Sequence, residues 1–155
     1  MTPLQYEARV RALIGDDEVC RLFMSIPGVG PLTALVYKSA IDDPKRFAKS
    51  ANAGVHLGLT PRKYASGEID YNGRITKCGD PLTRSHLFEA AMVLMRRSAR
   101  TSALKAWGTR IVRRGSMKKA YVVVARKLAV FMHRMLLDGT AFDFGVEPAA
   151  IAGMN

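Results

Sequence analysis

Residues 22–35 read LFMSIPGVGPLTAL. Apolar residues at helical spacing lie on both sides of a Pro-Gly-Val-Gly-Pro turn, which predicts two short helices joined as a helix-hairpin-helix. Gly28 and Gly30 carry no side chain, so the turn can bring backbone N–H groups and the positive end of the second helix against a phosphate oxygen. Such contacts position a nucleic-acid backbone without reading its sequence. An ordinary turn between two packed helices would use the same residues.

Further helices are predicted on both sides of this hairpin, and the fold class is mainly α. The helix that begins at 81 is introduced by Asp80 as N-cap and by Pro81 in the first turn. Residues 58–80 have no helical period, and they are predicted to form a loop or a small β-hairpin around Tyr71-Asn72-Gly73. The expected architecture is a compact helical domain. Its helices are predicted at 3–14, 16–25, 32–40, 44–48, 51–57, 81–99, 101–114 and 116–137.

The chain is strongly basic. Its 155 residues include 24 Lys or Arg and 13 Asp or Glu, which gives a formal charge of +11 and a pI near 10.1. Hydrophobic residues make up 48% of the chain, enough to bury a core, so the charge must lie on a folded surface. Residues 1–60 carry +1, residues 61–138 carry +12 and residues 139–155 carry −2. A polyanionic partner is therefore expected, and nucleic acid is favoured over a membrane because no helix has the Trp- and Phe-rich apolar face that binds bilayers.

Several protein classes are excluded by the sequence. Cys20 and Cys78 lie far apart without a CxxC pattern, and the three His residues have no ligand-spaced partner, so neither disulfides nor a metal site is predicted. The N-terminus lacks the basic start and apolar run of a signal peptide. The most apolar run, residues 121–137, is interrupted by charged side chains and is expected to be a buried helix. A cytoplasmic protein is expected.

A second chemical feature is the hydroxyl of Ser66. Cations of Lys and Arg can neutralise the charge on a pentacovalent phosphoryl transition state and lower the pKa of an attacking hydroxyl. A serine nucleophile in a phosphodiester reaction would need such neighbours, yet Ser66-Gly67 is also a common turn pair. The residues alone leave both interpretations open. The cations that surround Ser66 in the sequence are Arg62, Lys63, Arg74, Lys77 and Arg84.

Several motifs, taken together in their order and spacing, resemble a known family. They are Ile26-Pro27-Gly28-Val29-Gly30, Gly58-Leu59-Thr60-Pro61, Ser66-Gly67, Gly73-Arg74-Ile75-Thr76-Lys77-Cys78-Gly79, Arg84 and Glu89-Ala90-Ala91. This set resembles the C-terminal domain of DEDD-type insertion-sequence transposases, relatives of the Piv invertase that include the bridge-RNA-guided recombinases. The resemblance covers about residues 20–100 and implies a function in DNA transposition or recombination.

The resemblance also implies roles for particular residues. Ser66 corresponds to the serine taken as the nucleophile of this domain. Family members carry an upstream RuvC-like domain whose carboxylates bind Mg²⁺, and this chain has no matching Asp/Glu set. The chain alone is therefore expected to be an inactive part of a transposase, without a cofactor of its own. Arg74, Lys77 and Arg84 fall in the basic block of the family. The expected phosphate-binding residues are Gly28, Gly30, Arg62, Lys63, Arg74, Lys77 and Arg84.

On this basis the chain divides into three parts. Residues 1–20 are expected to be the remnant of a helical linker to a missing N-terminal domain, residues 21–138 the transposase C-terminal domain with its hairpin near 22–40, and residues 139–155 a flexible tail. The alternative function is a non-catalytic helix-hairpin-helix module that binds nucleic acid, which needs the hairpin and the basic helices but not Ser66.

DNA is the expected partner, with a guide RNA as a further candidate. Lys119, Arg126 and His133 recur every seven residues along an otherwise apolar helix. They are predicted to form a polar stripe that packs against a second copy of the chain, so a homo-oligomer is expected.

Overall fold

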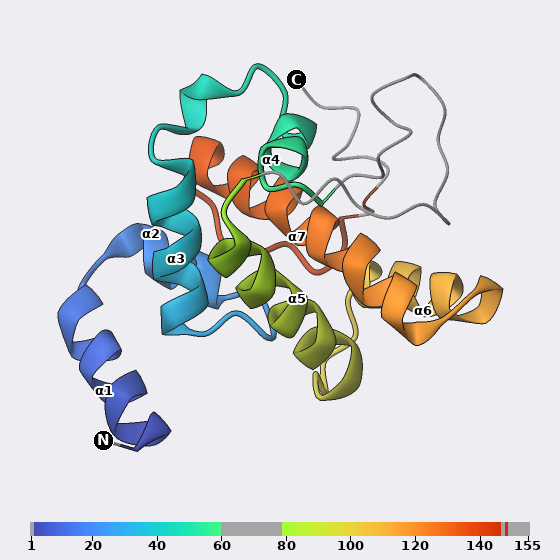
Figure 1. Cartoon of the computed structure of the whole chain (residues 1–155), viewed down its shortest axis with the longest axis horizontal. Coiled ribbons are helices and arrows are strands. Elements are labelled where there is room, and N and C mark those ends of the chain that lie inside the picture. Colours follow the sequence, from blue (N-terminus) through green and yellow to red (C-terminus); the bar gives the residue numbers. More distant parts are fainter. Residues whose placement is uncertain (1, 60–78, 147, 149–155) are drawn as a thin grey trace.

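The computed structural model describes residues 2–59, 79–146 and 148 (Figure 1). This part of the chain contains helices and no strand, which confirms the mainly α fold class. Residues 60–78, for which a loop or β-hairpin with Ser66 is predicted, lie outside the described residues. The helices are α1 (Pro3–Ile14), α2 (Glu18–Met24), α3 (Pro31–Ile41), the 3-10 helix η1 (Pro44–Arg46), α4 (Ala51–His56), α5 (Pro81–Arg96), α6 (Ala103–Arg114) and α7 (Met117–Asp138).

Local sequence sets the ends of these helices. Pro lies in the first turn of α1, α3 and α5, where the backbone N–H that it lacks has no intrahelical partner. The C-terminal end of α7 is set by Gly139, which takes a left-handed conformation with φ 67°. Five of the described α-helices begin with a side chain that accepts a backbone N–H of the first turn, and these N-caps are Thr2, Asp17, Asp80, Ser102 and Ser116.

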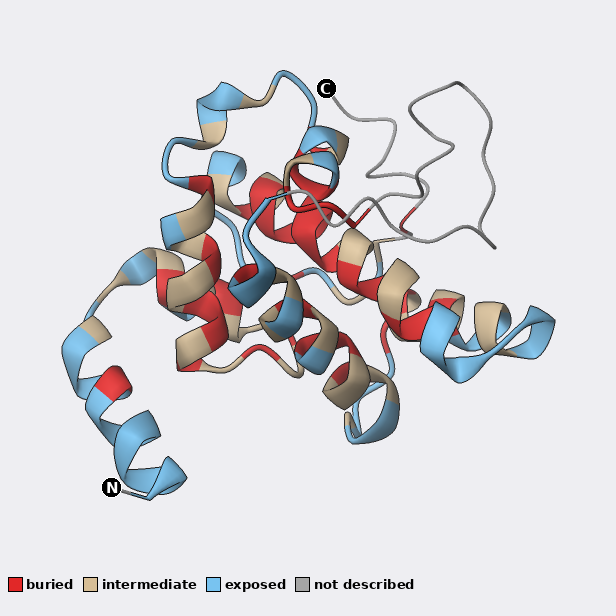
Figure 2. Ribbon diagram, viewed as in Figure 1, coloured by how far each residue is buried: buried red, intermediate tan, exposed pale blue. Residues whose placement is uncertain are grey.

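The core is built around α7. Half of this helix is buried, and Val124, Leu128 and Met132 have no exposed surface. Helices α2, α4, α5, α6 and η1 pack around it (Figures 1 and 2). Tyr37 of α3 also reaches α7, where its hydroxyl donates to the carbonyl oxygen of Ala129 at 2.6 Å, and burial raises the pKa of this tyrosine. Residues 121–137 therefore form the buried helix that their composition predicts.

The predicted polar stripe along α7 is wrong at His133. This side chain is fully buried, so it cannot face a second copy of the chain. Its Nε2 lies 2.7 Å from the carbonyl oxygen of Pro44 and its Nδ1 lies 2.9 Å from Ser50 Oγ. Because a carbonyl can only accept, Nε2–H donates to Pro44, and Nδ1 shares a hydrogen bond with the serine hydroxyl. His133 thus fastens η1 and the start of α4 to α7.

The beginning of the predicted flexible tail is packed against the body. Phe142 is 6% exposed, and its N–H donates to Ser25 Oγ at 2.8 Å. The carbonyl oxygen of Phe144 accepts from the N–H of Ala103 at 2.7 Å, and the two phenyl rings meet edge to face. These aromatic side chains bury apolar surface between α2, α6 and α7, which the small residues around them do not indicate.

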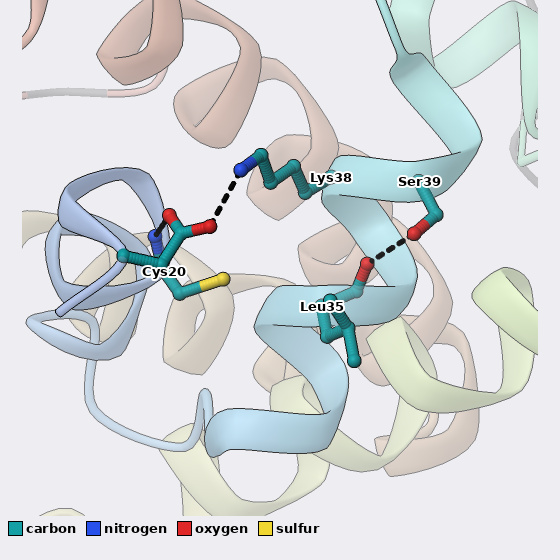
Figure 3. A network of polar contacts seen from close by, with 5 residues as sticks. Cys20, Leu35, Lys38 and Ser39 are labelled. Carbon is teal, nitrogen blue, oxygen red and sulfur yellow. Dashed lines mark hydrogen bonds and ion pairs between the residues drawn. The ribbon is translucent and has the colours of Figure 1, made fainter. Parts of the chain in front are cut away.

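An ion pair joins the start of α2 to the last turn of α3, at the end of the two helices that lies away from their connecting turn (Figure 3). Asp17 Oδ1 accepts from the N–H of Cys20 at 3.1 Å, and Asp17 Oδ2 accepts from Lys38 Nζ at 2.6 Å. The hydrogen bond from Lys38 is the main cause that holds the pKa of Asp17 below its usual range, and the same bond raises the pKa of Lys38. Both side chains are partly exposed, so the pair contributes about 1 kcal/mol or less to stability.

A first prediction concerns Gly108, where α6 crosses α5 and α7. A Cβ at this position would lie 2.6 Å from Met95 Sδ and 2.8 Å from Val124 Cγ2. Gly108→Val is expected to lower the free energy of unfolding by about 2 kcal/mol, because Val124 is fixed in the packed face of α7. Urea unfolding followed by circular dichroism measures the loss. Thr109→Val places the same side chain on the exposed face of the same helix, and an equal loss in both variants would contradict the close packing.

A second prediction concerns the pH dependence of stability. Asp17 has a lower pKa in the folded chain than in the unfolded chain, so its contribution is full above the unfolded value and is lost as the pH falls through the folded value. Asp17→Asn keeps an N-capping side chain but removes the charge. The difference in unfolding free energy between wild type and Asp17→Asn should be steady near pH 7 and shrink below about pH 4. A difference that is unchanged at pH 3 would contradict this, and Asp16→Asn, which alters a carboxylate that is 99% exposed, is the control.

Candidate nucleic-acid interface

The turn between α2 and α3 is held in place by side chains that it buries in the core. Ile26 is 1% exposed and Val29 is 5% exposed, so both side chains lie in the core. The N–H of Val29 donates to the carbonyl oxygen of Ile26 at 3.1 Å and closes the turn. Before it, the hydroxyl of Ser25 donates to the carbonyl oxygen of Leu22 and ends α2. The backbone between the two helices is therefore held in one position.

Gly28 is required by the packing of this turn against α5. Its φ of 99° lies in the region that L side chains rarely adopt. A Cβ would also lie 2.5 Å from the carbonyl oxygen of Ala90 and 3.1 Å from the N atom of Leu94. Any side chain would thus push the turn away from α5. The contact of Gly28 with a phosphate stays a prediction.

Gly30 is in a different environment. It is the N-cap of α3 in an extended conformation, and its carbonyl oxygen accepts from the N–H of Ala34 at 3.0 Å. No side chain caps the helix there, and a Cβ built on Gly30 has no atom within 4 Å. Of the two glycines, Gly30 is the one beside which there is room for a ligand, at the positive end of an eleven-residue helix.

The two ends of the segment 60–78 lie against the same short helix, α4. Leu59 is 3% exposed, and its N–H donates to the carbonyl oxygen of Gly54 at 3.0 Å. At the other end, Gly79 has φ 89° and packs so closely on the carbonyl group of His56 that no side chain would fit. The chain therefore enters and leaves this segment at one place on the domain.

Asp80 and Arg84 organise the start of α5 at this place. Asp80 accepts from the hydroxyl of Thr83 at 2.6 Å and from the N–H of Leu82 at 3.0 Å. These bonds, that of Thr83 first, hold the pKa of Asp80 below its usual range. Arg84 Nη1 donates to the carbonyl oxygen of Leu57 at 3.3 Å and so joins α5 to the end of α4. A guanidinium charge is thereby fixed beside the two ends of the segment that contains Ser66.

Helix α5 is the scaffold shared by the sequence-predicted site residues that the structure describes, namely Gly28, Gly30 and Arg84. Gly28 packs at Ala90, which is six residues after Arg84 and therefore about 9 Å further along the helix axis. The other predicted residues lie outside the described residues, and their roles stay predictions. They are Arg62, Lys63, Ser66, Arg74 and Lys77.

Two residues near Gly30 were not indicated by the sequence. Thr33 Oγ1 in the first turn of α3 lies 3.5 Å from His86 Nδ1 on α5. The two residues are 53 positions apart, so no local pattern relates them. Their contact joins the start of α3 to the same helix that carries Arg84.

Among the described residues, no three His, Cys, Asp or Glu side chains come together as metal ligands. The Mg²⁺ that the family resemblance implies therefore has no fitting ligand set in this part of the chain, and we assign it no chemical step. No helix in the same part is both long and apolar enough to cross a membrane.

Comparison with known proteins identifies the family. A family model described as "Transposase IS116/IS110/IS902 family" matches residues 20–107, more than half of the chain. The chain is 32% identical over 141 residues to the transposase for insertion sequence element IS1111A of Coxiella burnetii, covering 90% of the chain and 39% of that protein. It is 29% identical over 140 residues to the transposase for insertion sequence element IS1328 of Yersinia enterocolitica, covering 90% and 42%.

A third relative is the pilin gene-inverting protein of Moraxella bovis, 28% identical over 124 residues, covering 79% of the chain and 38% of that protein. The chain thus spans about two fifths of the length of these three relatives. The family match covers most of α2, the turn that follows it, α3, the segment 60–78 and α5. The chain belongs to the IS116/IS110/IS902 transposase family.

Proposed function

We propose that the chain is the C-terminal, DNA-binding and serine-carrying domain of an insertion-sequence transposase, which acts in DNA transposition or recombination. The observation that carries this proposal is the position of the family match, because residues 20–107 contain both the α2–α3 hairpin and the segment with Ser66. The relatives' names state transposition and gene inversion. The charge of +12 over residues 61–138 supports DNA as the partner.

In the proposed reaction, the hydroxyl of Ser66 attacks a phosphorus atom of the DNA backbone. A bond forms between Oγ and phosphorus, the bond from phosphorus to the 3′ oxygen breaks, and the proton lost by the serine is balanced by one gained at the released 3′ hydroxyl. A 3′ hydroxyl of another strand then attacks the phosphoserine, and Ser66 leaves with its proton restored. Each step exchanges one phosphoester bond for another, so no external energy source is needed.

The cations have two roles in this proposal. Arg74, Lys77 and Arg84 hold the reacting phosphate and stabilise its added charge. Arg62 and Lys63, together with the N–H groups near Gly28 and Gly30, hold neighbouring phosphates. Arg84 is suited to its role because its bond to Leu57 fixes it beside the two ends of the serine segment. The RuvC-like domain that the family resemblance implies, a guide RNA and a second copy of the chain are further proposed partners.

A third prediction tests the turn. Gly30→Val adds a side chain where a phosphate would approach, while leaving the backbone conformation and the core unchanged. The dissociation constant for duplex DNA should rise about three- to tenfold, as expected for the loss of one or two backbone contacts worth about 1 kcal/mol each. Fluorescence anisotropy with a labelled duplex measures this.

Gly145→Val is the matched control, because this glycine is exposed and a Cβ there meets only Asp143 Oδ1 at 3.5 Å. Gly28→Val is not a suitable substitution, since it would displace the turn from α5. Equal DNA affinities for Gly30→Val and wild type would show that Gly30 contacts no phosphate and is part of an ordinary turn.

A fourth prediction tests Ser66. Ser66→Ala should leave DNA affinity nearly intact but remove every covalent protein–DNA adduct, because the phosphoserine link cannot form. The assay mixes the chain with the RuvC-like domain of a close relative, supplies nicked donor DNA and Mg²⁺, and detects protein-linked DNA after denaturation.

Ser85 is the control hydroxyl, since it is exposed on α5 and Ser85→Ala should still give adduct. Thr83 is a poor competitor for the role because it is buried and donates to Asp80. Adduct that persists in Ser66→Ala would show that the nucleophile is another residue. A parent protein that binds DNA and assembles with the RuvC-like domain, but never forms adduct, would favour the non-catalytic binding module.

A further inference from the structure

The net positive charge of the chain is concentrated in one region. Residues 90–137 contain twelve Lys or Arg and no Asp or Glu. The rest of the chain therefore has twelve cations against thirteen acids, and is nearly neutral. The region includes the end of α5, all of α6 and nearly all of α7. None of the residues to which the proposed function assigns a role lies in it.

Helix α6 presents two chemically different faces. Leu104 and Gly108 are buried, and Gly108 packs against α5 and α7. Lys127 of α7 lies over the ring of Trp107 at 5.7 Å, so this aromatic ring is covered by a cation. The opposite face borders a shallow groove in which hydroxyl and cationic side chains alternate. The groove is lined by Thr101, Lys105, Ala106, Thr109, Arg110 and Arg113.

The connection from α6 to α7 extends this basic face. Residues 113–119 are all exposed, and four of the seven are cations, Arg113, Arg114, Lys118 and Lys119. Ser116 caps α7 through the N–H of Lys119, so the positive end of a 22-residue helix lies among them. Figure 1 shows that α6 and the start of α7 project on the side opposite α1, α2 and α3, and Figure 2 shows their joint as exposed. We call these four cations, together with Arg110, the basic joint.

Such a concentration of one charge destabilises the isolated fold and favours a polyanion. Like charges on adjacent turns repel, and residues 90–137 contain no Asp or Glu. Within this region the pKa of Lys127 is lowered, by burial first and by the neighbouring charge of Arg126 second. Phosphates bound along the joint would relieve this repulsion and release counterions.

The chemistry of the joint fits a duplex backbone. Among the described residues of α6 and the joint, the one aromatic side chain is Trp107, which is only partly exposed and has Lys127 over its ring, so stacking on bases is not favoured. A twelve-residue helix is about 18 Å long, about half of one turn of duplex DNA. Long Arg and Lys side chains with neighbouring hydroxyls are the groups that bind phosphates without reading sequence.

We propose that the basic joint and the groove along α6 are a second docking surface for duplex DNA, separate from the turn at Gly30. It lies on the other side of α5 from that turn, and it would hold DNA flanking the reacting phosphate. The surface goes beyond the proposed function because it needs neither the serine segment nor the hairpin.

The test neutralises the joint and measures DNA affinity at several salt concentrations. The joint variant carries Arg113→Gln, Arg114→Gln, Lys118→Gln and Lys119→Gln. The control variant carries Arg9→Gln, Arg11→Gln, Lys45→Gln and Lys49→Gln, exposed positions that lower the net charge equally elsewhere. The slope of log affinity against log salt should fall by about 0.9 for each lost phosphate contact in the joint variant and stay close to wild type in the control. The dissociation constant of the joint variant should rise at least tenfold at about 0.1 M salt.

Equal behaviour of the two variants would overturn the second surface while leaving the proposed function intact. A wild-type chain that binds no duplex DNA would overturn both. Loss of affinity for duplex RNA but not for duplex DNA would contradict the assignment to DNA. If the surfaces are independent, the fold-changes of Gly30→Val and of the joint variant should multiply when the two are combined.

A footprint on the unmodified chain keeps the proposal testable even if the joint variant misfolds. Lysine acetylation followed by mass spectrometry should show Lys118 and Lys119 protected by duplex DNA, with Lys45 and Lys49 unprotected. Acetylation of Lys118 and Lys119 that DNA does not change would contradict the proposal.

Discussion

Helix α7 has to be covered on several sides at once, and the arrangement of the other helices follows from this requirement. The buried residues of α7 are not confined to one narrow face. Val124, Leu128 and Met132 are fully buried, and so are several of the residues next to them in the sequence. A helix that is apolar around most of its circumference is stable in water only at the centre of a domain. Helices α2, α4, α5 and α6 supply the cover, and the buried imidazole of His133 is satisfied by Ser50 and Pro44.

Close approach of backbones then sets where the proposed DNA-binding surfaces lie. Gly28 lets the hairpin turn contact the backbone of α5, and Gly108 lets α6 cross α5 and α7. Larger residues at these positions would move the hairpin or α6 outward. The first contact leaves Gly30 uncovered at the start of α3, and the second orients the basic face of α6 toward solvent. The two surfaces with cationic or N–H donors therefore depend on the same packed helix, α5.

The distribution of charge agrees with a domain that holds a long polyanion. The N-terminal helices are nearly neutral and are tied by the ion pair of Asp17 and Lys38, while residues 90–137 have no acid at all. A one-sided field of this kind would orient the proposed DNA partner during encounter and raise the rate of association. Arg84 connects this field to the serine segment, because its bond to Leu57 fixes the start of α5 beside both ends of residues 60–78.

Local features of the fold could be read from the residues, because each depends on neighbours in the chain. The N-cap Asp80 and the buried character of residues 121–137 both follow from side chains within one or two turns. The family could be named for a similar reason, since its motifs are short and ordered along the chain. The packing role of Gly28 and the burial of His133 could not be predicted from the sequence, because both depend on contacts with residues more than sixty positions away. The anchoring of Phe142 by Ser25 is of the same kind. Periodicity reports which face of a helix is apolar, whereas only the folded chain brings distant faces together and selects which glycine is enclosed and which stays open to a ligand.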